Sequence, residues 1–126
     1  MMIKILTLIG VGGALGSIAR FIIAQAVQRH FVNSGFPYGT LAVNVAGCLV
    51  IGIVYGLSER FNWMTPEWRV FLATGICGGF TTFSSFSYES IALIRDSEIL
   101  YAGLNVAISV ITGFAATFIG LSLTKL

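Results

Sequence analysis

The sequence predicts an all-α membrane protein with four transmembrane helices. Of its 126 residues, 56% are hydrophobic and 10% are charged, whereas soluble domains carry about 25% charged residues. Four apolar runs cover about residues 3–28, 37–58, 67–94 and 99–123. Each run meets the roughly 20 residues that are needed to cross about 30 Å of hydrocarbon. Most charges lie in the short gaps between these runs, so residues 1–126 are expected to form a single transmembrane domain.

The first run begins with a segment that imitates a dinucleotide-binding turn. "IKILTLIGVGGALG" reads as a strand followed by closely spaced glycines. A dinucleotide fold would place an acidic residue about 20 positions further on. The first acidic residue of this chain is Glu59, and the next segments are apolar enough to span a membrane. The context therefore excludes a nucleotide site.

Polar residues follow one face of the second run and one face of the fourth. Pro37 suits the first turn of the second helix. After it come Thr40, Asn44 and Cys48 at steps of four, and the fourth run repeats this step with Asn105, Ser109, Gly113 and Thr117. Steps of four stay on one helix face. Each row is expected to face protein or water, either as interhelical hydrogen bonds or as part of a transport path.

The third run carries the strongest signs of an irregular helix. Thr65-Pro66-Glu67 reads as an N-cap followed by a first-turn proline and an acid. Further on, three glycines precede "FTTFSSFS", where hydroxyl groups can satisfy freed backbone groups: Gly75, Gly78 and Gly79. We expect this helix to break near mid-bilayer, where a break must be buried or line a cavity. Its exposed carbonyls could then bind a cation.

Small residues at helix-packing spacing predict close helix contacts. Gly12 and Gly16 are four apart, as are Gly52 and Gly56, which is the pattern that lets helices approach closely in lipid. Four helices alone cannot enclose a wide aqueous path, so a homo-oligomer is the expected working form. Packing of these glycines within one subunit is the alternative interpretation.

The basic residues do not impose one orientation in the membrane. With four spans, both termini and the second loop share one side, which holds Lys4, Arg60, Arg69 and Lys125. The other side holds Arg29 and Arg95, with Arg20 inside the first helix. This small bias in positive charge predicts a chain that inserts in both orientations.

Several residues of the apolar runs could guide an anion. Arg20 at a pore mouth would raise the local anion concentration, although it could also anchor its helix at the interface. N–H and O–H donors could replace the water around a small, tightly hydrated anion, and they are supplied by Asn44, Ser84, Ser85 and Ser109. The weakly positive ring edges of Phe83 and Phe86 could face the same ion.

Three motifs carry a resemblance to a known family: "GGALGSIAR" at 12–20, "GTLAVNVAG" at 39–47 and "TGICGGFTTFSSFSYE" at 74–89. They resemble the Fluc family of small four-helix fluoride channels, also called CrcB, and the similarity spans the whole chain. The resemblance implies a passive channel that exports fluoride from the cytoplasm and relieves its toxicity. It also implies an antiparallel, dual-topology homodimer in the cell membrane, in bacteria the inner membrane, with one structural sodium ion on its two-fold axis. Its partners would be fluoride, lipid and a second copy, with no nucleic acid.

The resemblance also assigns roles to individual residues. The backbone carbonyls of Gly78 and Thr81 match the sodium ligands. Phe83 and Phe86 match the phenylalanine box, which Asn44 accompanies. The remaining matches are a vestibule arginine, a hydroxyl pair, an acid beyond that pair and a serine of the fourth helix: Arg20, Ser84 with Ser85, Glu89 and Ser109.

Two other functions remain open at this point. A small proton-coupled multidrug or cation exchanger can also be a four-helix, dual-topology dimer, but it would need a carboxylate deep in its first helix, and that helix has no acid. A membrane assembly subunit without transport would leave the polar rows unexplained. An enzyme is not expected, because the single histidine, His30, has no nucleophile pattern near it.

Overall fold

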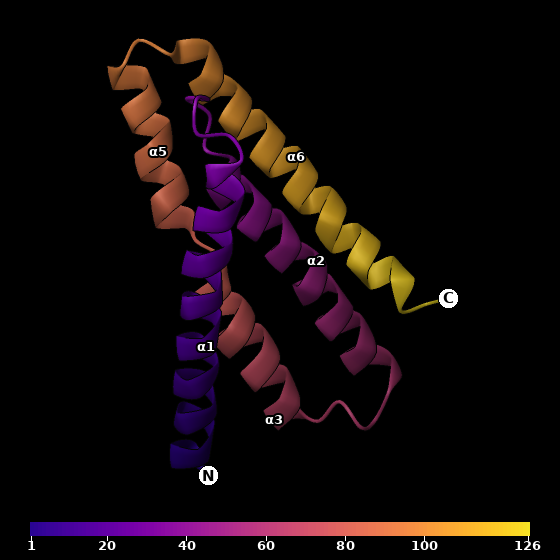
Figure 1. Ribbon diagram of the computed structural model, residues 1–126. Coiled ribbons are helices and arrows are strands. Elements are labelled where there is room, and N and C mark those ends of the chain that lie inside the picture. The colour runs from indigo at the N-terminus through magenta and orange to yellow at the C-terminus, as the bar shows by residue number, and fades with distance from the viewer.

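The computed structural model describes residues 1–126, and all of its regular structure is helical (Figure 1). Three long helices are continuous: α1 (Met2–Arg29), α2 (Tyr38–Arg60) and α6 (Ile99–Leu123). The third apolar run forms four consecutive pieces: α3 (Pro66–Arg69), the π-helical segment η1 (Val70–Cys77), α4 (Gly78–Phe80) and α5 (Phe83–Arg95). No strand is present.

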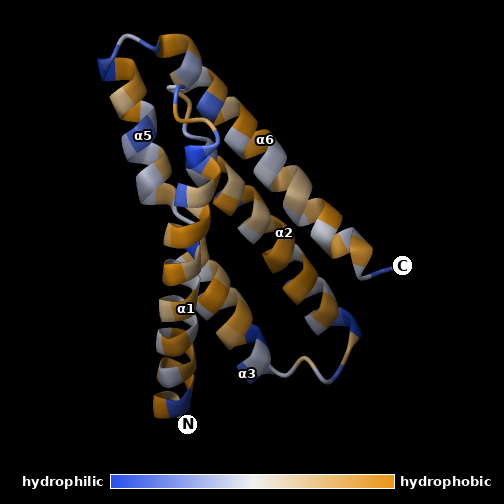
Figure 2. Cartoon of the chain, viewed as in Figure 1, coloured by the Kyte–Doolittle hydropathy of each residue, from blue (hydrophilic) through white to orange (hydrophobic).

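The helices run up and down between two ends of the molecule. The N-terminus and the α2–α3 loop lie at the lower end of Figure 1, whereas the α1–α2 and α5–α6 connections lie at the upper end. Four segments are long and apolar enough to cross a membrane, which are the three continuous helices and Pro66–Arg95. Figure 2 shows hydrophobic residues along them and hydrophilic ones mainly at the ends and on α5. The predicted all-α class with four spanning segments is confirmed.

The third segment begins with a capped turn and is interrupted once, between α4 and α5. Thr65 caps its start by accepting a hydrogen bond from the Trp68 backbone N–H at 3.4 Å, and Pro66 follows in the first turn. After α4 the backbone becomes extended at two residues, with φ −86° and ψ 157° at Thr81 and φ −150° and ψ 122° at Thr82. Thr82 then caps α5 by accepting from the Ser85 N–H at 3.1 Å. Helical hydrogen bonding therefore stops between α4 and α5.

Glycines bring α1 against the third segment. A Cβ on Gly12 would lie 2.8 Å from the Phe71 carbonyl oxygen and 2.9 Å from Gly75 Cα, and one on Gly16 would collide with the Ile76 carbonyl. From the other side, a Cβ on Gly79 would lie 2.5 Å from the Gly13 carbonyl oxygen. Only residues without side chains allow this approach. The backbones of α1, η1 and α4 therefore touch directly.

The second close contact joins α2 to α6. Gly52 faces the Thr117 carbonyl and Gly120, while Gly56 lies against the Thr124 side chain. At the lower end, the Arg60 guanidinium donates a hydrogen bond to the Thr124 carbonyl. Both glycine pairs noted in the sequence therefore pack helices within one subunit.

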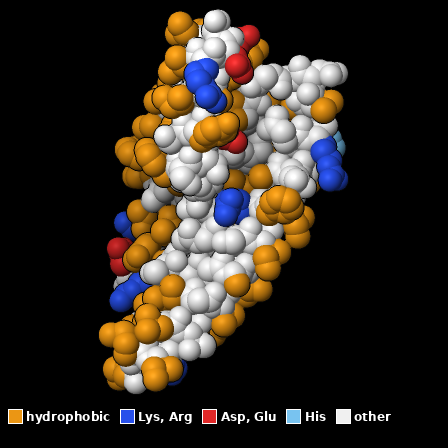
Figure 3. Space-filling model, turned by 90° about the vertical axis from the view of Figure 1, so that its left-hand side faces the viewer, with side chains coloured by type: hydrophobic (Ala, Val, Ile, Leu, Met, Phe, Trp, Pro, Cys, Tyr) orange, Lys and Arg blue, Asp and Glu red, His pale blue; other side chains and the backbone are white.

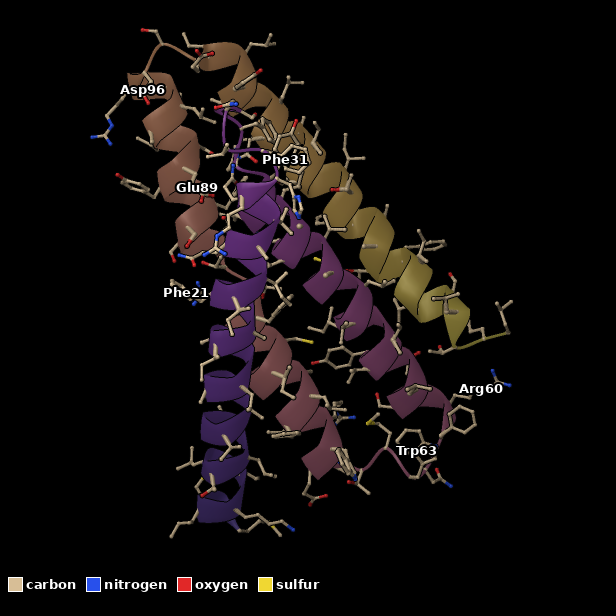
Figure 4. The ribbon with its side chains drawn as sticks, in the orientation of Figure 1. Phe21, Phe31, Arg60, Trp63, Glu89 and Asp96 are labelled. Carbon is tan, nitrogen blue, oxygen red and sulfur yellow. The ribbon has the colours of Figure 1, made fainter.

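Most of the apolar surface of the subunit is uncovered. Only 11% of the residues in the most apolar window of α1, and 17% in that of α6, are buried. In Figure 3, hydrophobic side chains gather along the margins and at the lower end of the side face, and the charged ones are scattered singly or in small groups. Trp63 and Trp68 are 58% and 51% exposed near the α2–α3 loop, where Figure 4 labels Trp63 beside Arg60. Aromatic residues at that end suit the membrane interface, and lipid or protein must cover the rest.

The α2–α6 contact predicts a position-specific effect of added bulk. Gly120→Ala should lower the free energy of unfolding by about 1–3 kcal/mol, as overpacking does, because its methyl would meet the Leu49 carbonyl and the Ile53 nitrogen, both backbone atoms. Gly103→Ala is the matched control on the same helix, since nothing lies within 4 Å of its added carbon. Thermal unfolding in detergent compares them, and equal midpoints would contradict this packing.

Candidate functional site

The interruption between α4 and α5 is held open by one side chain of α2. The Asn44 side-chain Nδ2 donates a hydrogen bond to the Thr82 carbonyl at 3.0 Å, and its Oδ1 accepts from the Thr82 backbone N–H at 2.7 Å. One amide thus satisfies both backbone groups of a residue outside the helices. A half-buried backbone without such a partner would be costly, so Asn44 stabilises the extended conformation.

Two backbone carbonyls beside the interruption have lost their helical donors. In a continuous helix, the Gly78 carbonyl would accept from the Thr82 N–H, but that N–H donates to Asn44. The Thr81 carbonyl would accept from the Ser85 N–H, which instead donates to Thr82 Oγ1. Gly78 and Thr81 are the residues that the resemblance matches to sodium ligands. Both carbonyls lack the usual i+4 donor.

A cavity lies beside the interruption, between α2 and the third segment. Its volume is about 310 Å³, and it opens to the surface of the subunit. Half of the predicted site residues line it: Asn44, Gly78, Thr81, Phe83 and Phe86. Cys48 and Cys77 are also in the wall, and both are free thiols. The structure therefore brings the predicted phenylalanines, the asparagine and the two carbonyl residues around one space.

The two phenylalanines form a tilted pair at the start of α5. Their ring centroids are 5.7 Å apart, with 55° between the ring planes. Phe83 is 78% exposed in the single subunit, and Phe86 is partly buried. Their neighbours Ser84 and Ser85 lie in the same turn, where the Ser84 hydroxyl is 3.2 Å from Thr82 Oγ1. Neither serine lines the cavity.

Arg20 reaches the interruption from α1. Its Nε donates a hydrogen bond to the Gly79 carbonyl at 3.1 Å, and the side chain is partly buried. Ser17, one turn earlier, approaches the same carbonyl at 3.5 Å. The guanidinium therefore lies against α4 and does not extend to the end of its helix. Its remaining N–H groups carry positive charge at the level of the interruption.

Glu89 belongs to α5 but makes its hydrogen bond with α2. Its Oε2 accepts from the Thr40 hydroxyl at 2.8 Å, and its buried Oε1 has no hydrogen-bond partner. Figure 4 shows this residue midway along α5. Asn44 lies one turn further along α2 than Thr40, so the polar row of α2 holds α5 at two successive points.

Ser109 lies apart from the other predicted site residues. Its hydroxyl donates to Asn105 Oδ1 at 3.3 Å on the same helix, and it does not line the cavity. Asn105 is 1% exposed and donates to the Ser90 hydroxyl at 3.0 Å. Asn105 thus meets α5, whereas Thr117, further along the same polar row, donates to the Cys48 carbonyl of α2 at 3.2 Å.

Two details of the site go beyond what sequence reasoning found. Thr82 is the N-cap of α5; a threonine three residues before a serine N–H at a suspected break could have indicated this. Gln28 bridges α1 to the start of α2, because its Nε2 donates to the Phe36 carbonyl at 3.1 Å and its Oε1 accepts from the Gly39 N–H at 2.9 Å. An amide near the end of an apolar run, as at Gln28, was the available signal.

Comparison with known proteins gives a consistent result across the chain. Residues 7–121 match the family described as "CrcB-like protein, Camphor Resistance (CrcB)". A protein of Chlorobium phaeobacteroides (strain BS1) named "Fluoride-specific ion channel FluC" is 48% identical over 96% of this chain and 93% of its own length. Proteins of the same name from Chlorobaculum tepidum and Flavobacterium psychrophilum are 47% and 43% identical, over 100% and 97% of this chain and 98% of each relative.

These matches confirm the resemblance that the three motifs carried. The relatives are named as channels, which are not a class of enzyme. Together with the four apolar helices, the matches confirm the predicted location as a multi-pass protein of the cell membrane, in bacteria the inner membrane. The family match covers most of the chain and the relatives share more than two-fifths of its residues, so this protein belongs to the CrcB family of membrane proteins.

Proposed function

We propose that this protein is a passive, fluoride-selective ion channel that lets fluoride leave the cytoplasm. The observation that carries the proposal is the cavity at the interruption, whose wall contains Asn44, Phe83 and Phe86. The relatives named as fluoride-specific ion channels support the choice of ion. In acid surroundings HF enters a cell and dissociates in the more alkaline cytoplasm, so the trapped anion needs an exit.

The groups around the cavity suit a small anion. Fluoride is tightly hydrated, and a selective path must replace its water with hydrogen-bond donors. Asn44 Nδ2 has two hydrogens, of which one is given to the Thr82 carbonyl, so the second can meet an ion. The edges of Phe83 and Phe86 carry weak positive charge. None of Ser84, Ser85 and Ser109 lines the cavity, so we assign their hydroxyl groups to the path beyond it.

Arg20 gives the path its positive charge. Its guanidinium lies against α4 beside the interruption, and a cation in a low-dielectric cleft raises the local concentration of anions. Glu89 lies further along α5 and keeps one oxygen on Thr40. We assign Glu89 to the outer part of the path, where its hydrogen-bonded side chain could be displaced as an ion passes.

A second copy of the chain completes the proposed channel. We infer an antiparallel homodimer, because the uncovered apolar surface of one subunit is large and the basic residues are nearly balanced between its two ends. The interruption would then lie near mid-bilayer in each copy. Gly78 is exposed at the cavity in the single subunit, as a residue that contributes to a shared site must be.

The released carbonyls fit a structural sodium ion between the copies. Sodium at interrupted membrane helices is bound by unwound backbone carbonyls, and the carbonyls of Gly78 and Thr81 have lost their usual helical donors. Two copies would supply four oxygens at the centre of the dimer. The ion's proposed role is to hold the two chains together.

The channel proposal predicts fluoride release that is limited only by charge balance. Proteoliposomes loaded with potassium fluoride should release it without a proton gradient once valinomycin carries potassium out. Without valinomycin, release should stall, because each departing fluoride leaves an uncompensated charge. A fluoride electrode outside the vesicles records the rate.

Chloride-loaded vesicles provide the control for selectivity. Chloride should stay trapped under the same conditions, because its larger radius does not fit a path narrowed by Phe83 and Phe86. Release that needs a proton gradient, ignores valinomycin, or proceeds equally for chloride would reject the channel and favour the exchanger.

Substitutions in the cavity wall should slow fluoride transport while the protein stays folded. Phe83→Ile keeps the apolar side chain but removes the weakly positive ring edge that would face the ion, so we expect fluoride release to slow about tenfold. Asn44→Asp should slow it at least as much, because a carboxylate would face the Thr82 carbonyl without a donor and repel an anion. Phe114→Ile is the matched control, since Phe114 is also 78% exposed but lies on α6. Wild-type rates in both wall variants would mean that the path lies elsewhere.

The dimer and its ion can be tested on one variant. Cys48→Ala, Cys77→Ala and Asn62→Cys together leave one thiol in the α2–α3 loop. An impermeant maleimide applied to cells should label about half of the copies, because the two orientations are close to equal in an antiparallel dimer.

Purification with choline in place of sodium should lower fluoride release. Uniform labelling would contradict dual topology, and full activity after sodium removal would contradict the structural ion.

A further inference from the structure

A chain of three polar side chains, two of them buried, joins α5 to α6. Asn105 Nδ2 donates to the Ser90 hydroxyl at 3.0 Å, and Asn105 Oδ1 accepts from the Ser109 hydroxyl at 3.3 Å. Asn105 is 1% exposed and Ser90 is 7% exposed. We call these three residues the Asn105 bridge. Val43 and Asn105 are the largest fully buried side chains in the subunit, so an amide occupies one of the least accessible positions of an apolar protein.

The bridge depends on the relative position of α5 and α6. An amide in an apolar interior must satisfy its N–H and C=O groups, and losing one partner leaves the other unsatisfied. The two ends of the Asn105 side chain have different partners, on α5 and on its own helix. A serine hydroxyl can donate or accept, so the amide can bond both serines only while Ser90 and Ser109 stay within reach of its two ends. Sliding or rotation of α5 against α6 would break the Ser90 bond.

The helix that the bridge holds has few other attachments. Its start is fixed to α2 through Asn44 and Thr82, and Glu89 accepts from Thr40 on the same helix. Both attachments lie on the side of α2. The Asn105 bridge is the side-chain hydrogen bond that ties α5 to α6.

Ser90 shares a face of α5 with both cavity phenylalanines. Phe86 is four residues before Ser90, and Phe83 is seven residues before it. At 3.6 residues per turn, these spacings place the three side chains on one stripe of the helix. Fixing the direction of Ser90 therefore fixes the rotation of α5 and the direction in which both rings leave it.

We propose that Asn105 is a positioning residue for the ion path: by binding Ser90 it sets the rotation of α5, and with it the orientation of Phe83 and Phe86 at the cavity. This inference rests on the proposed fluoride conductance. Asn105 itself does not line the cavity, so it acts on the ion only through α5. Ser109, one turn further along α6, holds the other end of the amide by donating to Asn105 Oδ1.

The test uses four variants in the vesicle assay: Asn105→Leu, Ser90→Ala, their combination and Ser122→Ala. Reconstitution at about one dimer per vesicle separates two quantities. A folding defect lowers the fraction of vesicles that release fluoride, whereas misplaced rings lower the rate within each active vesicle. Ser122→Ala is the control, because that exposed hydroxyl of α6 bonds only to the Phe118 carbonyl of its own helix, at 2.9 Å.

We expect Ser90→Ala and Asn105→Leu each to lower the rate per active vesicle about tenfold, within the range of coupling seen for contacting residues. The combined variant should recover the yield of folded dimer, because removing both partners leaves no unpaired group at that contact. Its rate should nevertheless stay as low as that of the single variants, since the bond that orients α5 is absent. Ser122→Ala should match the wild type.

Each remaining outcome decides against the inference. Multiplied losses in the combined variant would show that Ser90 and Asn105 act separately. Recovery of the wild-type rate in that variant would show that the bridge affects only the stability of the folded protein. Wild-type rates in both single variants would show that the bridge does not orient the two rings. A wild type that releases no fluoride would instead reject the proposed function, and the positioning role with it.

Discussion

The structure depends on the pair of hydrogen bonds between Asn44 and the backbone of Thr82. An extended residue inside an apolar helix leaves an N–H and a C=O that lipid cannot satisfy. The Asn44 side-chain amide forms a hydrogen bond with each of them. Because the Thr82 N–H is taken, the Gly78 carbonyl is released, and because Thr82 is outside the helix, its hydroxyl can cap α5. The released Gly78 carbonyl and the new helix start, next to which Phe83 lies, both follow from this contact.

A closely packed frame surrounds this interruption. Backbone contacts at Gly12, Gly16 and Gly79 fix α1 against η1 and α4, and those at Gly52 and Gly120 fix α2 against α6. These contacts leave no side chain that could change rotamer, so the two pairs of helices are held at one distance. Against this frame, α5 is attached by side-chain hydrogen bonds, which orient it without close backbone approach. The frame is thus held by backbone packing, and α5, which carries Phe83 and Phe86, by hydrogen bonds.

Much of the fold could be predicted from the sequence because hydrocarbon imposes simple rules. Apolar runs bounded by charges predicted four spanning segments, and the confirmed helices begin and end within a few residues of them. The cavity residues Asn44, Phe83 and Phe86 were named from motifs and polar spacing, and the structure brings them together. The partners of Asn105 and Gln28 could not be predicted, because i+4 spacing gives a helix face but not the helix that it meets. The role of the glycine pairs was also open, since contact within a subunit and contact between subunits use the same residues.

The interruption at Thr81 and Thr82 also has an electrostatic consequence. A helix end carries about half an elementary charge, positive where its N–H groups are free and negative where its carbonyls are free. Ending α4 and starting α5 within two residues places a negative end and a positive end side by side. A continuous helix from Pro66 to Arg95 would have neither between its two ends. One break in one chain therefore offers opposite polarities at neighbouring points, so a bound cation and a passing anion would not compete for the same backbone groups.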